Sequence, residues 1–195
     1  MLKANESVND ENGELRRKEN KWFDAMGHDY IRKAFVRANK ADPTAVLCLN
    51  EYGIEGKVEN ETAKFNGIKK LLIDLKEKGA PVHALCWQMH VDPTSFDAET
   101  FLARTTEIAD LGFDNYITEL DVKLPEKATA ADYEAQKQTF KKIVETFLKV
   151  RRRQALTIWG LRDGSPHWLP KNHPLLFDED YKKKSAYFGV QEALK

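Results

Sequence analysis

Short apolar segments alternate along this chain with longer segments that are apolar on one side only. The short segments cover residues 46–50, 82–89, 116–120 and 155–159, and their composition is typical of buried strands. In the longer segments apolar residues recur every three or four positions, which predicts helices over 22–40, 61–78, 101–111 and 129–148. Strands that alternate with helices of this length predict βα units around a parallel sheet.

Residues that start or stop helices stand at these boundaries. Pro43 ends the first predicted helix, and Gly79 and Gly112 follow the last apolar positions of the next two. Thr129 and Asp132 have the three-residue spacing of a capping box, with Asp in the return position. The local chemistry of the helix ends therefore agrees with the periodicity.

Each predicted strand ends in polar or aromatic side chains. In chain order these are Asn5-Glu6 after a short strand remnant, Asn50-Glu51-Tyr52, Gln88 with His90, Glu119 with Asp121, and Trp159-Gly160. The active site of a (β/α)₈ barrel is built from the carboxyl ends of several strands, whereas a doubly wound sheet gathers such groups at one switch point. We therefore predict an α/β fold that is part of a (β/α)₈ barrel. Five strands are visible and a complete barrel has about 250 residues, so we expect the last five βα units without the first three.

Two carboxylates stand at the end of one predicted strand. Glu119 and Asp121 are two residues apart, which places them on the same side of the pleat. An ionised carboxylate is costly to bury unless it is paired and hydrogen-bonded. We therefore expect chemistry at this strand end.

The composition fits one globular domain over residues 1–195, with 42% hydrophobic and 32% charged residues. Thirty-one Lys and Arg balance thirty-one Asp and Glu, so we expect neither nucleic acid nor a membrane surface as a partner. No apolar stretch approaches the roughly 18 residues that span a bilayer. Cys48 and Cys86 lie in apolar runs without a CxxC pair; we expect small buried hydrophobic residues, with a disulfide or a metal role as alternatives.

Two motifs and a C-terminal segment add a more specific signal. The motifs are Asn-Glu-Ser-Val-Asn-Asp at 5–10, followed by Gly13 and Leu15-Arg16, and Ile-Thr-Glu-Leu-Asp-Val at 117–122; the C-terminal segment is Leu-Leu-Phe-Asp at 175–178 with Tyr181, Lys184, Ala186 and Tyr187. Taken with the order of the strand-end residues, they resemble glycoside hydrolase family 10, the endo-β-1,4-xylanases. The likeness covers essentially the whole chain.

The resemblance implies a retaining hydrolysis of xylan or xylo-oligosaccharides without a metal or other cofactor. It implies Glu6 as the acid/base and Glu119 as the nucleophile, with His90 and Asp121 holding Glu119 oriented and anionic. Repulsion between like charges would keep Glu6 protonated while Glu119 is ionised. The substrate contacts that it implies are those of Asn5, Asn50, Tyr52, Gln88, His90, Trp159 and Trp168, with Asn5 on the sugar 2-hydroxyl and the two tryptophans as a stacking platform.

Two alternatives and two further expectations accompany this hypothesis. A partial barrel has open sheet edges, so a non-catalytic fragment that binds carbohydrate weakly is one alternative. Completion by a missing N-terminal half or by self-association is expected if the chain is active. A metal-dependent hydrolase using His90 and Asp92 is the other alternative. The resemblance also implies secretion, with the export signal in the missing part.

Overall fold

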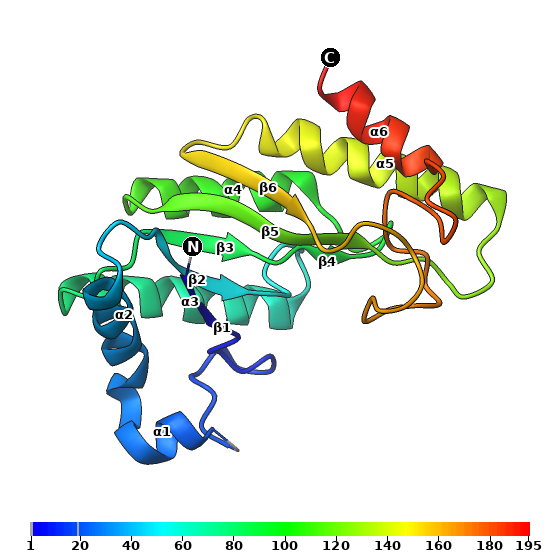
Figure 1. Cartoon of the computed structure of the whole chain (residues 1–195). Coiled ribbons are helices and arrows are strands. Elements are labelled where there is room, and N and C mark those ends of the chain that lie inside the picture. Colours follow the sequence, from blue (N-terminus) through cyan, green and yellow to red (C-terminus); the bar gives the residue numbers. More distant parts are fainter. Residues whose placement is uncertain (1, 19) are drawn as a thin grey trace.

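A parallel β-sheet with helices packed on one face forms the framework of the chain in this computed structural model, which describes residues 2–18 and 20–195 (Figure 1). The elements follow in the order β1 (Leu2–Asn5), α1 (Lys21–Met26), the 3₁₀ helix η1 (Gly27–Asp29), α2 (Tyr30–Ala41), β2 (Leu47–Glu51), α3 (Glu59–Glu77), β3 (Ala84–Trp87), β4 (His90–Val91), α4 (Ala98–Asp110), β5 (Asp114–Val122), α5 (Ala130–Phe147), β6 (Arg153–Ile158) and α6 (Ser185–Ala193).

The strands run in one direction and follow one another across the sheet. The order is β1-β2-β3-β5-β6, with the two-residue β4 beside the end of β5, and every strand pair is parallel. A helix follows each of the five main strands, so the chain has five successive βα units. The predicted parallel α/β architecture is therefore confirmed.

Two local details differ from the sequence prediction. The helix expected over 22–40 is divided, because Gly27 adopts a left-handed φ of 65° between α1 and η1. The short β4 after Met89 was not predicted, since two residues carry no periodic signal. The capping box at Thr129 and Asp132 is present as expected, with each side chain bonded to the other's backbone amide.

Alternate residues of the strands face two different hydrophobic clusters. Leu49, Leu85 and Ile117 belong to the large core that includes the apolar faces of the helices. Cys48, Ala84 and Cys86 form a small second cluster, against which Tyr116 packs. Because side chains alternate along a strand, the small cluster lies on the sheet face opposite to the helices.

Cys48 and Cys86 are joined in a disulfide between β2 and β3. The prediction that both are buried is correct, but the prediction that they are unpaired hydrophobic residues is wrong. The parallel register places Cys48 opposite Ala84 and Cys86 opposite Asn50, so both sulfur atoms lie on one face of neighbouring strands. The proximity of the two cysteines depends on the register between β2 and β3. The helix α3 separates these strands in the sequence, so the sequence pattern does not fix their register.

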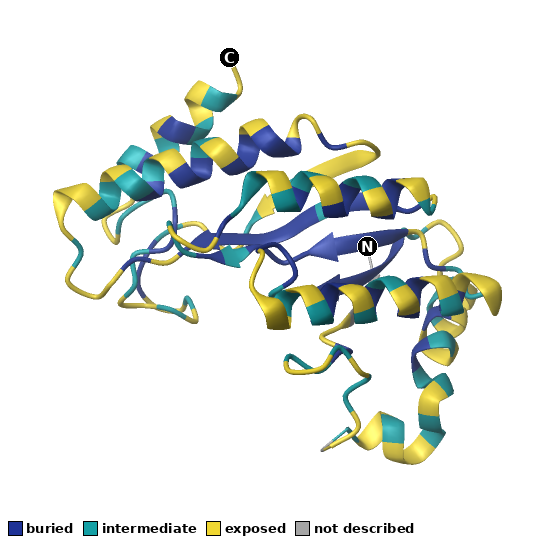
Figure 2. Ribbon diagram, turned by 180° about the vertical axis from the view of Figure 1, so that it is seen from behind, coloured by how far each residue is buried: buried dark blue, intermediate teal, exposed yellow. Residues whose placement is uncertain are grey.

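The last strand differs from the others in exposure. β2 and β3 are buried throughout, whereas β6 is exposed or half-exposed along its length (Figure 2). β6 pairs with β5 on one side, and no described strand pairs with its other side. No helix in the described part of the chain combines the length and apolar character that a bilayer crossing requires.

Candidate active site

The carboxyl ends of the main strands surround a cavity of about 770 Å³. Its eight lining residues are Asn5, Glu6, Tyr52, Gln88, His90, Glu119, Trp159 and Trp168. All eight were predicted from the sequence as site residues. The two remaining predicted residues, Asn50 and Asp121, are buried beneath the cavity and hydrogen-bond to residues that line it.

Glu119 is the more deeply placed of the two candidate carboxylates. It lies near the end of β5, the strand between β3 and β6, and is 7% exposed. The Asn50 amide Nδ2 donates to Oε1 of Glu119 at 3.1 Å, and Nε2 of His90 lies 3.4 Å from Oε2. Each carboxylate oxygen therefore has a nitrogen of a neighbouring side chain beside it.

Asn50 is itself held in one orientation. The hydroxyl of Thr118 donates to its Oδ1 at 2.7 Å, which leaves Nδ2 to donate toward Glu119 and toward Oδ1 of Asn5. Asn50 and Gln88 each stand two residues after a member of the small cluster, and Thr118 stands two residues after Tyr116, which packs against it. The three side chains therefore lie on the same sheet face. The alternation of the strands thus delivers these polar side chains to the cavity floor.

Glu6 occupies an exposed position immediately after β1. It adopts a left-handed φ of 52°, which is uncommon for a residue other than glycine, and its backbone N–H donates to the carbonyl of Asn50 at 2.9 Å. Its Oε1 accepts from Nδ2 of Asn5 at 2.9 Å and from Nε2 of Gln88 at 3.4 Å. A chain of amides, Asn5 and Asn50, thereby connects Glu6 with Glu119.

His90 lies beside Glu119 and faces the buried carboxylate of Asp121. Nδ1 of His90 lies 3.0 Å from Oδ2 of Asp121, and Asp121 is 1% exposed. Burial opposes protonation of the imidazole, but the adjacent Asp121 carboxylate and the charges of Glu119 and Glu55 together raise the pKa of His90. In its protonated state the ring carries an N–H on each nitrogen, with Nδ1 facing Asp121 and Nε2 facing Glu119.

Aromatic side chains form the outer wall of the cavity. Trp159 is 43% exposed and Trp168 is 56% exposed, which leaves apolar ring surface open to a ligand. Nε1 of Trp168 donates to Oδ2 of Asp121 at 2.8 Å, so this ring is tied to the buried carboxylate. The hydroxyl of Tyr52 is engaged with Asp10 and Arg16, and burial together with the Asp10 carboxylate raises the pKa of Tyr52 to about 12.

Glu55 is a buried residue of the site that the sequence interpretation missed. Its carboxylate accepts from the backbone N–H of Ile54 at 2.7 Å and of Met89 at 3.0 Å, and burial raises the pKa of Glu55. Met89 has a left-handed φ of 66° between Gln88 and His90, so Glu55 supports the bend that presents both of these side chains. An acidic residue in a loop after a strand gave no signal of such burial.

His167 was also missed. Its Nε2 lies 3.5 Å from Oδ2 of Asp121, and burial lowers the pKa of His167. From the sequence, the segment before Trp168 is only a loop of polar residues. The position of this loop next to Asp121 depends on tertiary contacts.

The alternative metal site finds no geometric support. Among residues 2–18 and 20–195, no three His, Cys, Asp or Glu side chains gather in a way that could hold a metal ion. Asp92 instead accepts from the backbone N–H groups of Thr94 and Ser95 in a local turn. The fold therefore does not bring His90 and Asp92 together as a catalytic pair.

Parallel strands in sequential order, with a polar cavity at their carboxyl ends, define this chain as part of a (β/α)₈ barrel. The model of glycosyl hydrolase family 10 matches residues 4–193. The chain belongs to this family.

Individual relatives agree with the family assignment. The chain is 34% identical over 197 residues to endo-1,4-beta-xylanase B of Thermotoga neapolitana, covering 98% of this chain and 55% of that protein. Xylanase 10B of Thermotoga maritima superposes with a TM-score of 0.89 at 35% identity, covering 97% of this chain and 58% of that one. A mutant of an intracellular xylanase of Thermoanaerobacterium saccharolyticum, solved in complex with xylotetraose, superposes with a TM-score of 0.85 at 32% identity. The match covers 95% of this chain and 55% of that one.

These coverages describe a partial barrel. The chain spans little more than half the length of the relatives just compared, while nearly all of it is matched. The prediction of a partial (β/α)₈ barrel is thus confirmed.

Proposed function

We propose that this site hydrolyses the β-1,4 bonds of xylan by a double displacement with retention of anomeric configuration. The observation that carries the proposal is the cavity itself, whose walls hold Glu6 and Glu119 from strands at different places in one sheet. Retaining glycosidases need two such carboxyl groups about 5–5.5 Å apart across the scissile bond. Family membership supports the choice of a glycosidic bond over other substrates.

In the first step, Glu119 attacks the anomeric carbon while Glu6 gives its proton to the leaving oxygen. The glycosidic C–O bond breaks, and an ester bond forms between the sugar and Glu119. In the second step, Glu6 takes a proton from water, the hydroxide oxygen bonds to the anomeric carbon, and Glu119 leaves as a carboxylate. The contacts of Glu119 with Asn50 and His90 support its role as the anionic partner.

The proposed substrate contacts follow from the shape and chemistry of the cavity. Asn5 and Asn50 form the polar floor between the carboxylates, where the 2-hydroxyl of the sugar would accept or donate hydrogen bonds. Trp159 and Trp168 offer apolar ring faces, on which pyranose rings stack. The complex of the Thermoanaerobacterium saccharolyticum xylanase mutant with xylotetraose supports the proposal that this cavity binds a xylo-oligosaccharide.

A second candidate is a carbohydrate-binding partial barrel without turnover. The observation in its favour is β6, whose exposed residues and unpaired side leave the sheet open in the described structure. We propose that activity needs this open sheet to be completed, either by an N-terminal half or by a second copy. Family membership alone does not assign a compartment, because one relative is described as intracellular, so secretion stays a prediction.

Turnover of an aryl xylobioside by the purified chain distinguishes these candidates. Activity that disappears in both Glu119→Ala and Glu6→Ala supports the hydrolase. A folded chain that binds xylotetraose without turnover supports the binding fragment. Size-exclusion chromatography with light scattering, performed on the same sample, shows whether an active species is a monomer or a self-associated form.

A further inference from the structure

The loop that carries Glu6 is attached to a helix that does not itself reach the cavity. We propose that Lys64 of α3 is a positioning residue that, together with Glu51, holds this loop and thereby places Glu6 for catalysis. The inference rests on the proposed function, and it concerns residues 6–16, here called the acid/base loop.

Lys64 is a buried cation with three partners. Its side chain is 2% exposed, and Nζ lies 3.0 Å from Oε1 of Glu51 and 2.6 Å from Oδ1 of Asp10. Nζ also lies 3.4 Å from the ring centroid of Tyr52, which lines the cavity. One ammonium group thus joins β2, the acid/base loop and a wall of the site.

Glu51 continues the connection toward Glu6. Its Oε2 accepts from the backbone N–H of Val8 at 3.3 Å, two residues after Glu6, and its side chain is fully buried. Without Lys64, this buried carboxylate would lose the cation with which it is paired. The hydrogen bond to Val8 and the ion pair with Lys64 therefore act on the loop as one unit.

Backbone contact adds a second attachment on the same helix. A Cβ on Gly13 would overlap the carbonyl oxygen of Ala63, and one on Gly67 would overlap the carbonyl oxygen of Gly13. Only glycine permits this approach of the loop to α3. Lys64 and Gly67, one helical turn apart, therefore contact the same loop.

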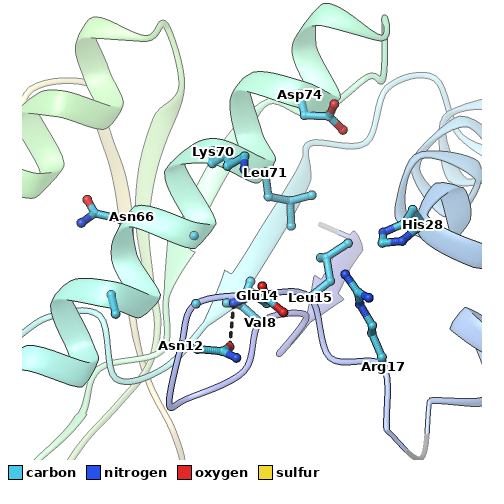
Figure 3. Close-up of a pocket in the computed structure, with 13 residues that line it drawn as sticks. Val8, Asn12, Glu14, Leu15, Arg17, His28, Asn66, Lys70, Leu71 and Asp74 are labelled. Atoms are coloured by element: carbon cyan, nitrogen blue, oxygen red, sulfur yellow. Dashed lines mark hydrogen bonds between the residues drawn. The ribbon is translucent and has the colours of Figure 1, made fainter.

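Apolar contacts attach one part of the acid/base loop. Val8 is 1% exposed and belongs to the large core together with Leu71 of α3, and Leu15 packs against that core. The same three residues also line an open pocket of about 610 Å³ between the loop and α3, so the apolar contact does not extend along the whole loop (Figure 3). The ion pairs and the glycine contact therefore add to the apolar attachment at Val8.

The chemistry is sensitive to this attachment because Glu6 has little support of its own. It is exposed, and its described side-chain hydrogen bonds come from Asn5 and Gln88, which also belong to the cavity. A displacement of about 1 Å in a reacting group lowers the rate of an enzyme by as much as ~10²-fold. A loosened loop would thus lower kcat while the sugar contacts on the other strands persist.

The main test compares Lys64→Met with Lys69→Met, which removes an exposed ion pair with Glu107 from the same helix. Hydrogen exchange of the loop amides is measured with kcat and KM on an aryl xylobioside. We expect exchange at Val8 and Arg16 to accelerate at least ~10-fold in Lys64→Met and kcat to fall ~10- to 100-fold, with KM within about threefold. Lys69→Met should match the parent protein in loop exchange, kcat and KM.

A double variant separates positioning from simple charge compensation. Lys64→Met/Glu51→Gln removes both charges, so it should recover stability in urea unfolding, yet Asp10 stays released from α3. We expect kcat to remain low in this variant. Recovery of both stability and kcat would overturn the proposal, because Lys64 would then serve only to neutralise Glu51.

Gly67→Ala disturbs the attachment of the acid/base loop without changing any charge. The added methyl group pushes the acid/base loop from α3, and Gly189→Ala is a matched control whose Cβ meets the backbone of Lys137 at 2.5 Å, away from the site. We expect faster loop exchange only in Gly67→Ala. Unchanged loop exchange in both Lys64→Met and Gly67→Ala would overturn the positioning role, whether or not the parent protein turns over substrate. A parent protein without turnover would instead favour the second candidate, the binding fragment, and the loop-exchange comparison would still decide the positioning role.

Discussion

The two candidate catalytic carboxylates stand in opposite structural circumstances. Glu119 lies on a strand with neighbours on both sides, is 7% exposed, and has Asn50 and His90 on its two oxygens. Glu6 follows β1, which pairs only with β2 among the described strands, and it is exposed in a left-handed backbone conformation. The sheet itself fixes the first carboxylate, whereas a loop fixes the second.

The difference fits the two chemical tasks. A nucleophile must be anionic and correctly aimed, which a rigid polar surround provides. An acid/base group must exchange protons with water during each cycle, which exposure permits. The comparison therefore predicts that substitutions near Glu119 act through charge and orientation, and that those near Glu6 act through loop position.

Removal of the nucleophile should give the largest effect. In Glu119→Gln the attacking oxygen is lost, and we expect kcat on aryl xylobioside to fall by at least ~10³-fold. Glu145→Gln on the exposed side of α5 is the control and should leave kcat unchanged. Retention of more than a tenth of the parent activity in Glu119→Gln would contradict the assignment.

Loss of the acid/base should depend on the leaving group. Glu6→Gln should lower turnover of xylan by ~10² to 10⁴-fold, and that of an aryl xylobioside with an acidic phenol leaving group much less. The phenolate departs without a proton, whereas a sugar alkoxide does not. Equal losses of turnover on both substrates would contradict the proposed acid/base role that distinguishes Glu6 from Glu119. Glu11→Gln in the same loop serves as the control.

The charge network behind Glu119 should appear in stability as a function of pH. The contacts with Asp121 and Glu119 raise the pKa of His90 in the folded protein, so their stabilisation is complete below about pH 6.5, the unfolded value, and is lost as pH rises through the folded value. The free energy of unfolding of His90→Gln should thus fall furthest below that of the parent on the acidic side. Urea unfolding between about pH 5 and pH 9 measures this difference, with the exposed His28→Gln as the control. If the loss of unfolding free energy in His90→Gln increased with pH, this would contradict a raised pKa of His90 in the folded protein.

The smallest effect is expected at the aromatic wall. Trp168→Phe keeps an aromatic ring but removes the donor to Asp121. We expect KM for xylo-oligosaccharides to rise about two- to fivefold with kcat nearly unchanged, since one hydrogen bond contributes about 1 kcal/mol. Trp22→Phe, on the exposed surface of α1, is the matched control. A large fall in kcat would mean that Trp168 also orients Asp121.

Much of the framework was readable from the sequence because the signals are local. The short apolar runs of the strands, the period of three to four in the helices and the capping box at Thr129 each depend on a few neighbouring residues. The polar residues at successive strand ends also predicted a shared site, because parallel strands present their carboxyl ends together. The fold, the βα count and the cavity residues at the strand ends follow from these signals, whereas Trp168 was expected only from the resemblance to glycoside hydrolase family 10.

The contacts between those residues were decided by tertiary structure. Asn50 and Glu119 are 69 residues apart, and Lys64 and Asp10 are 54 apart, so their meeting depends on strand register and on how α3 packs. The Cys48–Cys86 disulfide and the burial of Glu55 arise in the same way. Which side chains stand at the strand ends was already clear from the local pattern of residues. Only the folded sheet determined which are buried together, because burial and register are properties of distant segments in contact.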